Sequence, residues 1–313
     1  MIYTVTFAPA LDYAVWLERM IPGEVNRAQR TRLFAGGKGI NVSLVLKSLG
    51  IPSVCLGFTA GFTGAEIVRR LRQEGLGEQM VRLENGLSRI NVKLKGTEET
   101  EINASGPAVD EAAMKAFLRR LEALGPGDVL VLSGGVPQGS EETLYAQLTR
   151  MAVKKGAEAV VDATGAQLLN VLAERPMLIK PNLSELEAAT GTPVRTPAAL
   201  AERAESLRQQ GAKNVLVSLG AEGALLACGT GVYRCAAPRG TVLNTTGAGD
   251  TMVAAYLYAA RLGLEDAQRL RLCVAAGSAT AFSETLAAKE TVEEILGSTP
   301  MPVRVWKTAG DKF

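Results

Sequence analysis

A run of small residues that ends in one acid, directly before a helical pattern, constrains this chain more than any other feature. Residues 244–250 read Asn-Thr-Thr-Gly-Ala-Gly-Asp, and an apolar, helix-like segment begins at Thr251. Small residues let backbone N–H groups crowd together at a helix N-terminus, where unpaired donors and the helix dipole favour an anion. The sequence therefore predicts an anion nest at Gly247, Ala248 and Gly249, with the Asp250 carboxylate at its rim.

An acid beside such a nest suits phosphoryl transfer. The nest would take the charge of the transferred group, and the carboxylate of Asp250 would accept the proton of an attacking hydroxyl. The alternative is an ordinary helix with an acid in its first turn, which is also a stabilising position. The heptapeptide alone leaves both interpretations open.

The absence of histidine narrows the possible chemistry. The 313 residues contain no histidine at all, which excludes Ser-His-Asp and Cys-His hydrolases, His-ligated zinc and histidine bases. Catalysis must then use carboxylates, Lys or Arg, hydroxyls and backbone groups. The net charge of +2 gives no electrostatic footprint for nucleic acid or an anionic membrane, and we expect neither as a partner.

Cysteine usage and the N-terminus indicate the compartment. The four cysteines are scattered without a C-x-x-C pair, which favours buried free thiols in a reducing environment. The first residues are β-branched and lack a basic region, so they predict a strand and not a signal peptide. No apolar run reaches the ~18 residues that span a bilayer. We expect a soluble, cytoplasmic protein.

Short apolar runs alternate with helical patterns through most of the chain, which predicts a parallel sheet covered by helices on both faces. The expected strands include residues 54–58, 128–132, 158–161, 177–179 and 214–218. Two other β-like stretches, 13–17 and 29–34, are too polar for central strands. Residues 88–95 alternate strictly and turn near Gly96 into 100–104, which predicts a hairpin. We assign these polar strands to a small separate sheet.

The polar face of that hairpin carries Arg89, Asn91 and Lys93. Such a face is either solvated surface or a holder for a substrate phosphate. A glycine cluster, Gly36-Gly37-Lys38-Gly39-Ile40-Asn41, precedes the next helix. Lys38 is followed by Gly39 where a Walker A loop needs Ser or Thr, so a nucleotide P-loop is not expected. The cluster is either a backbone site for a small ligand or a flexible turn.

Polar residues also follow several strands, at the sheet edge where ligands gather in α/β proteins. They are Asp12, Ser133–Pro137, Asp162–Thr164, Lys180–Glu185 and Ser218–Gly223. Asn182 and Glu185 lie three residues apart at a helix start, so together they can hold the waters of Mg²⁺. The same spacing fits a helix cap, and both roles can hold at once. The small residues 275–279 admit either a flat ligand or a close helix contact.

Three of these motifs, in this order, resemble those of the PfkB, or ribokinase-like, carbohydrate kinases over essentially the full length. Gly36–Asn41 resembles the N-terminal signature, Thr245–Asp250 the C-terminal one, and Asn182-x-x-Glu185 the family's N-x-x-E element. The resemblance implies a ribokinase-like three-layer α/β/α sandwich with a mainly parallel central sheet and a small β-sheet lid. Residues 1–313 would form a single kinase domain, with the lid built from inserted segments at about 12–34 and 88–105.

Within the family the chain is most similar to enzymes that phosphorylate fructose 1-phosphate, especially at residues 36–42, 89–94, 100–103 and 217–225. The resemblance therefore implies ATP-dependent transfer to the C6 hydroxyl, giving fructose 1,6-bisphosphate. Tagatose 6-phosphate and fructose 6-phosphate are alternative acceptors. An alternative of a different class is a non-catalytic regulator that binds a sugar phosphate or a nucleotide. A homodimer through the lid sheet is also implied.

The resemblance assigns a role to each candidate residue. Asp250 would be the base and Gly247, Ala248 and Gly249 the anion hole. Substrate contacts would come from Asp12, Gly36, Gly37, Lys38, Asn41, Arg89, Asn91 and Lys93. ATP contacts would come from Lys180, Asn182, Ser218, Gly220, Gly223, Ala276 and Gly277, and Mg²⁺ would be held through water by Asn182 and Glu185. The family loop S-G-S-x-P reads Ser-Gly-Gly-Val-Pro at residues 133–137, so a hydroxyl is missing at Gly135.

Overall fold

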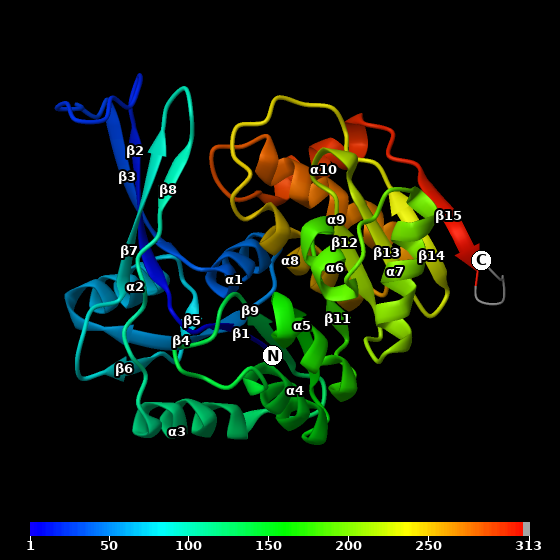
Figure 1. The fold of residues 1–313 in the computed structure, drawn as a ribbon, viewed down its shortest axis with the longest axis horizontal. Helices are drawn as coiled ribbons and strands as arrows, with labels where there is room; N and C mark the ends of the chain where they lie inside the picture. The colour runs from blue at the N-terminus through cyan, green and yellow to red at the C-terminus, as the bar shows by residue number, and fades with distance from the viewer. Residues whose placement is uncertain (309–313) are drawn as a thin grey trace.

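The computed structural model describes residues 1–308, and an 11-stranded sheet crosses most of the molecule (Figure 1). Its order is β15-β14-β13-β12-β11-β10-β9-β1-β4-β5, with β6 beside β4. The strands are β1 (Ile2–Thr6), β4 (Ser53–Ala60), β5 (Gly77–Glu78), β6 (Val81–Leu83), β9 (Val129–Ser133), β10 (Glu158–Asp162), β11 (Leu178–Ile179), β12 (Val215–Ser218), β13 (Ala224–Cys228), β14 (Gly231–Cys235) and β15 (Val303–Thr308). The pairings from β5 to β12 are parallel, which confirms the mainly parallel sheet.

Helices cover both faces of this sheet, as expected for a three-layer sandwich. One face packs against α3 (Glu111–Arg120), α4 (Leu144–Lys154), α5 (Gly165–Asn170), α6 (Leu183–Thr190) and α7 (Pro197–Gln209). The other packs against α1 (Lys38–Ser48), α8 (Ala248–Arg261), α9 (Asp266–Ala281) and α10 (Lys289–Ser298). Consecutive side chains of β9 alternate between the two cores: Leu130 and Leu132 enter the first, and Val131 the second.

The antiparallel end of the sheet was not predicted. β13 and β14 form a hairpin beside β12, and β15 pairs with β14 at the edge. The sequence pattern for β13 is weak, because it is a short apolar run of five residues, and periodicity alone cannot assign such a run to a strand. Gly223 makes the turn before it, with φ at +90° and the carbonyl of Cys235 where a Cβ would stand.

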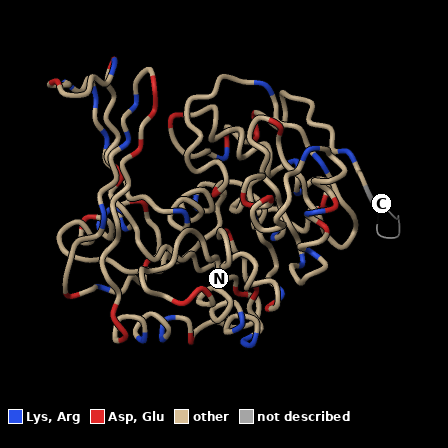
Figure 2. The backbone as a smooth tube through the Cα atoms, in the orientation of Figure 1, with Lys and Arg blue, Asp and Glu red and all other residues tan. Residues whose placement is uncertain are grey.

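A second sheet of four strands stands away from the body (Figure 1). We call it the lid sheet. Its order is β3-β2-β7-β8, formed by β2 (Ala10–Trp16), β3 (Arg30–Gly36), β7 (Arg89–Lys95) and β8 (Thr100–Ile102). Charges of both signs run along these strands (Figure 2). The register places Asp12 opposite Asn91, so their side chains share one face. Helix α2 (Gly61–Gln73) packs between the lid sheet and the body.

The described part of the chain bears on two further expectations. All four cysteines are buried and free, which confirms the prediction of unpaired thiols. No helix within residues 1–308 is long and apolar enough to cross a membrane.

Candidate active site

Helix α8 begins without a side-chain cap. Its N-cap is Gly247, whose φ of +84° favours glycine, and a Cβ there would lie 2.5 Å from Leu286 Cδ2. A Cβ on Gly249 would lie 3.1 Å from Lys180 Nζ, so an ammonium group stands against the helix start. Gly247 and Gly249, two residues of the predicted anion nest, thus lie where the helix dipole and a cation both attract negative charge.

Asp250 lies in the first turn of α8 with only 5% of its surface exposed. Its Oδ2 accepts a hydrogen bond of 2.8 Å from Asn41 Nδ2 in the first turn of α1. Burial raises the pKa of Asp250 to about 6, and the charge of Asp162 acts in the same direction. The carboxylate is therefore a stronger base than an ordinary aspartate while remaining mostly ionised at neutral pH.

A second buried acid, Asp162, is the last residue of β10 and pairs with two lysines. Lys38 Nζ lies 3.1 Å from Asp162 Oδ2, and Lys180 Nζ lies 3.3 Å from Oδ1. Burial alone would raise the pKa of Asp162, but the two ammonium groups hold it below its ordinary value. Burial would conversely lower the pKa of Lys38, and Asp162 and Asp250 raise it, so Lys38 stays protonated. Asp162 thus fixes two cations beside the anion nest.

The glycine cluster before α1 is required by close packing. A Cβ on Gly37, the N-cap of α1, would clash with the methyl group of Thr6, and one on Gly36 would clash with the Asp12 carboxylate. Thr6 Oγ1 in turn accepts a hydrogen bond from the Ile40 N–H. The N-cap residue of α1 has no side chain to cap it, and the Thr6 hydroxyl takes one first-turn N–H instead. The starts of α1 and α8 meet at the Asn41–Asp250 hydrogen bond.

The lid sheet contributes an organised polar group around Asp12. Asn91 Nδ2 donates to Asp12 Oδ1 at 2.8 Å, and Lys93 Nζ lies 3.2 Å from Asp12 Oδ2. Lys93 also lies 3.6 Å from Glu101, so its charge is balanced by two carboxylates. Arg89 donates through Nε to the carbonyl of Ala8 at 2.9 Å. Of the expected phosphate-binding cations on this hairpin, Lys93 is therefore the less available for a phosphate.

Most candidate residues line one cavity of about 390 Å³ between the lid sheet and the body. They are Asp12, Gly37, Lys38, Asn41, Arg89, Asn91, Lys93, Lys180, Asn182, Glu185, Ser218, Gly247, Gly249 and Asp250. Three further lining side chains, Glu101, Asp162 and Thr246, lie in stretches that were named from the sequence but had been given no role. Asp162 was named among the polar residues after buried strands, and its pairing with two lysines was not predicted.

A second cavity of about 530 Å³ adjoins the first and shares Gly37, Lys38 and Arg89 with it. The loop that carries Gly135 lines it, and a Cβ on Gly135 would meet no other atom, so a hydroxyl is missing there without being replaced. Ser133 lines it as well, and its Oγ is buried without a hydrogen-bond partner. Because it lies at the wall of a cavity, this hydroxyl is available to a water molecule or a ligand.

Asn182 and Glu185 form the helix cap that their spacing allows. Asn182 Oδ1 accepts from the Glu185 N–H and Glu185 Oε2 from the Asn182 N–H, each at 2.8 Å. Both side chains nevertheless line the first cavity. Residues 1–308 contain no cluster of three or more Cys, Asp or Glu side chains that could hold a metal alone. Mg²⁺ usually takes one or two carboxylates plus water and substrate phosphate, so Glu185 in this place fits it.

Several candidate residues lie outside the two cavities. Gly36, Ala248, Gly220, Gly223, Ala276 and Gly277 do not line either one. Ala276 is fully buried, and a Cβ on Gly277 would lie 3.0 Å from Met252 Cγ. Helices α8 and α9 thus meet in the close contact that the small residues also allowed. An adenine contact at these two residues stays a prediction.

The buried acid at the start of α8, the two lysines paired with Asp162 and the polar face of the lid sheet border one cavity, an arrangement that suits phosphoryl transfer to a hydroxyl group. The model of the pfkB family of carbohydrate kinases matches residues 5–291, and the chain belongs to this family. It is therefore an enzyme that phosphorylates an alcohol group of a sugar phosphate, and kinase chemistry implies ATP as the donor.

Named relatives agree with this class. The chain is 41% identical to a 1-phosphofructokinase of Bacillus subtilis over 95% of its length and 97% of that relative. It is 36% identical to a D-tagatose-1-phosphate kinase of Bacillus licheniformis over 91% of the chain and 94% of that relative. The fold is similar to phosphofructokinase-2 of Escherichia coli in complex with substrates and products, with a TM-score of 0.90 and 29% identity, covering 95% and 98% of the two chains.

Proposed function

We propose that the protein transfers the γ-phosphoryl group of ATP to the C6 hydroxyl of fructose 1-phosphate, giving fructose 1,6-bisphosphate. The observation that carries this proposal is the position of Asp250, buried in the first turn of an uncapped helix and oriented by Asn41. A protein that only binds sugar phosphate has no need of a base with a raised pKa at that point.

In the proposed reaction Asp250 accepts the proton of the sugar hydroxyl as that oxygen attacks phosphorus. Asn41 keeps the carboxylate in one orientation through its 2.8 Å hydrogen bond. The anion nest, Lys38 and Lys180 stabilise the negative charge of the group in transfer. Bound Mg²⁺ would neutralise phosphate charge, and Asn182 and Glu185 would hold its water shell.

The existing phosphate of the substrate would lie toward the second cavity. Arg89 and Lys38 border both cavities, and the unpaired hydroxyl of Ser133 lies in the second. Asp12 would then hold sugar hydroxyls, with Asn91 and Lys93 fixing its two oxygen atoms. Replacing Arg89 with Ala should raise KM for the sugar phosphate about tenfold with little change in kcat. An unchanged KM would remove Arg89 from the substrate site.

Other acceptors remain candidates within the same reaction. One relative is named D-tagatose-1-phosphate kinase, so D-tagatose 1-phosphate is one candidate acceptor. It differs from fructose 1-phosphate only in its configuration at C4. Tagatose 6-phosphate and fructose 6-phosphate place the existing phosphate at the other end of the sugar. The relative that is most identical among those named here is a 1-phosphofructokinase, and this supports fructose 1-phosphate.

A sugar-phosphate panel tests the proposal. ATP consumption is measured with each of the four sugar phosphates at equal concentration and with none. We expect the highest kcat/KM with fructose 1-phosphate. Higher kcat/KM with another member would change the acceptor, and no sugar-dependent consumption with any of them would favour a regulator that only binds.

We also propose that two copies pair through the lid sheet. The face opposite Asp12 carries exposed apolar side chains, with Tyr13, Ile90 and Ile102 at 38%, 42% and 58% exposure. Pairing would cover this face. Light scattering should give twice the chain mass for the wild type and a smaller mass for Ile90→Asp. A wild-type monomer at micromolar concentration would contradict the dimer.

A further inference from the structure

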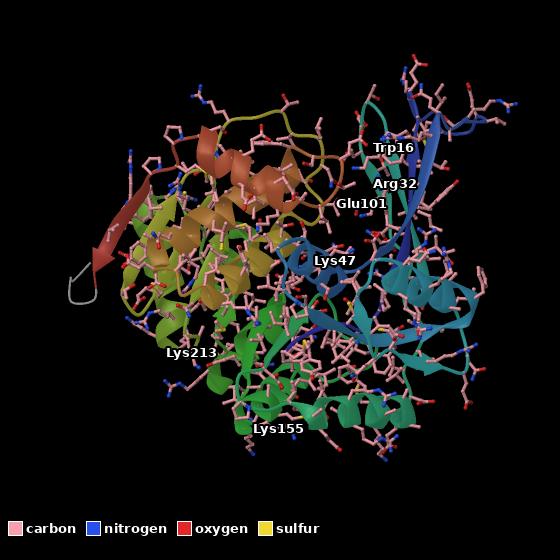
Figure 3. All side chains as sticks on the ribbon, turned by 180° about the vertical axis from the view of Figure 1, so that it is seen from behind. Trp16, Arg32, Lys47, Glu101, Lys155 and Lys213 are labelled. Atoms are coloured by element: carbon pink, nitrogen blue, oxygen red, sulfur yellow. The ribbon has the colours of Figure 1, made fainter. Side chains whose placement is uncertain are left out.

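Strand β8 carries a carboxylate that reaches from the lid sheet to the segment leading into α8. Thr246 Oγ1 donates a hydrogen bond to Glu101 Oε1 at 3.3 Å. The same oxygen lies 3.6 Å from Lys93 Nζ, which in turn pairs with Asp12. In Figure 3, Glu101 lies at the edge of the lid sheet nearest the body. One side chain thus touches both the proposed sugar side and the nest side of the cavity.

The residues that Glu101 approaches are those that shape the start of α8. Thr246 directly precedes Gly247. Asn244 holds Thr246 in a turn, because its Oδ1 accepts from the Thr246 N–H at 3.2 Å and its Nδ2 donates to the Thr246 carbonyl at 3.3 Å. Lys95 of the lid sheet donates to the same Asn244 oxygen at 3.4 Å. The lid sheet therefore contacts both residues of this turn.

We propose that Glu101 is a positioning residue that couples the lid sheet to the anion nest. The inference rests on the proposed function, because it assumes that sugar phosphate binds at Asp12 and that phosphoryl transfer occurs at Gly247. Glu101 holds Thr246 through its hydrogen bond and is tied to Asp12 through Lys93, so the sugar side of the lid sheet orders the turn before Gly247.

The length of the contact limits its strength. An optimal O–H···O hydrogen bond is about 2.7–2.8 Å, so the 3.3 Å bond between Thr246 and Glu101 is a weak one. A carboxylate acceptor makes a bond roughly twice as strong as a neutral one. Glu101 keeps 42% of its side chain exposed, so solvent screening limits the effect. We therefore expect a loss of about fivefold in kcat when the contact is removed.

A double-mutant cycle on the full-length protein tests the coupling. The variants are Glu101→Ala, Thr246→Val and the two combined, with Glu101→Gln as the conservative replacement that can still accept from Thr246. Glu98→Gln is the matched control, since Glu98 is an exposed acid in the adjoining turn of the same sheet. For each we measure kcat, KM for ATP and KM for fructose 1-phosphate, together with hydrogen–deuterium exchange of residues 242–249 without ligand.

Coupling predicts that each single change lowers kcat about fivefold, that the double variant loses no more than either, and that KM for ATP stays constant. Glu101→Gln should lose about twofold, and Glu98→Gln nothing. Exchange of residues 242–249 should be faster in Glu101→Ala and Thr246→Val and unchanged in the control. A 25-fold loss in the double variant, or a Thr246→Val enzyme with wild-type kcat and exchange, would overturn the proposal.

The exchange measurement separates this inference from the proposed function. If the wild type phosphorylates no sugar phosphate, the proposed function fails, and exchange still reports whether Glu101 orders the turn. If the wild type is active and exchange of residues 242–249 is the same in all variants, the coupling fails while the proposed function stands.

Discussion

Two helix starts border the same cavity, and they satisfy their N–H groups in opposite ways. Helix α6 begins with a capping box, in which Asn182 and Glu185 exchange two hydrogen bonds of 2.8 Å. Helix α8 begins at Gly247, and no side chain caps it. In α6 side chains satisfy the first N–H groups, whereas in α8 the Ala248 N–H donates only a long hydrogen bond of 3.4 Å to the Thr245 carbonyl. The start of α8 is therefore the better candidate of the two for binding an anion.

The acids in the first turns of α6 and α8 also differ, in their burial and in their hydrogen-bond partners. Glu185 accepts a backbone hydrogen bond at the rim of the cavity. Asp250 is almost fully buried, and that burial raises its pKa to about 6. A capped helix start with an acid is a structural feature of many proteins. Several other helices, among them α2, α4, α9 and α10, also lack a side-chain cap, so the buried acid and not the missing cap sets α8 apart.

Replacing the acid of α8 should have the largest effect. Asp250→Asn removes the base while its amide oxygen can still accept the hydrogen bond of Asn41, so kcat should fall by about 10³–10⁴ with ATP affinity within a factor of about three. Steady-state kinetics and calorimetric titration of ATP measure the two quantities. Glu290→Gln, an exposed first-turn acid of α10, is the control and should keep wild-type kcat. Turnover of Asp250→Asn near the wild-type rate would exclude Asp250 as the base.

The second-largest loss of kcat is expected from adding a side chain at the N-cap of α8. Gly247→Ala forces a Cβ to within 2.5 Å of Leu286 at a φ of +84° and displaces the nest, so kcat should fall by about 10²–10³. Gly263→Ala is matched to it, because Gly263 has a φ of +67° beyond the other end of α8 and its Cβ would meet nothing. The control should lose stability but keep kcat. Equal kcat losses in both variants would mean that backbone strain alone explains the effect.

The cost of the buried acid should appear as a pH-dependent stability. Because the pKa of Asp250 rises from 3.8 to about 6 on folding, its stabilising contribution is fully present below pH 3.8 and is lost as the pH rises through about 6. Asn at this position mimics the protonated acid at every pH. Asp250→Asn should therefore be more stable than the wild type by about 3 kcal/mol at pH 8 and equally stable near pH 3.8. Denaturant unfolding at both pH values measures this, and a difference independent of pH would contradict it.

At the start of α6, a single substitution separates the two roles of Glu185, as a helix cap and as a proposed holder of Mg²⁺. Glu185→Gln keeps an acceptor for the Asn182 N–H but loses the charge, so unfolding free energy should change little while the Mg²⁺ concentration for half-maximal rate rises about tenfold. Activity measured against Mg²⁺ concentration, with thermal unfolding alongside, tests both statements. A loss of stability without any change in Mg²⁺ dependence would leave Glu185 as a cap only.

The smallest effect is expected from the cap itself. Asn182→Ala removes the acceptor for the Glu185 N–H and should lower the free energy of unfolding by about 1 kcal/mol. Thr196→Ala, which removes the side-chain cap of α7, is the matched comparison away from the cavity. Similar losses are expected in the two variants. An Asn182→Ala protein as stable as the wild type would mean that the cap is compensated elsewhere.

Much of the architecture followed from local patterns. Apolar runs after polar loops identified the parallel strands, and strict alternation identified the β7 strand. The three signature motifs also located the cavity, because Asn41, Asn182 and Asp250 all line it. The strands are local in sequence, so periodicity predicts them. The signature motifs were recognised by their resemblance to a known family. The antiparallel edge was missed because β13 is short and wholly buried.

The pairing of charges could not be read from the sequence. Lys93 looked like a phosphate ligand, yet it lies between Asp12 and Glu101, which are far apart in sequence from each other. Asp162 looked like one polar residue in a loop, yet it fixes Lys38 and Lys180. Both arrangements depend on which strands are neighbours, and no local pattern encodes that.

The most direct test is a crystal structure with a non-hydrolysable ATP analogue and fructose 1-phosphate. We predict that the terminal phosphate of the ATP analogue lies against the backbone N–H groups of Gly247–Gly249. The C6 hydroxyl of the sugar should be hydrogen-bonded to Asp250. The 1-phosphate should lie near Arg89. A γ-phosphate bound away from the start of α8, or a C6 hydroxyl with no contact to Asp250, would contradict the proposed site.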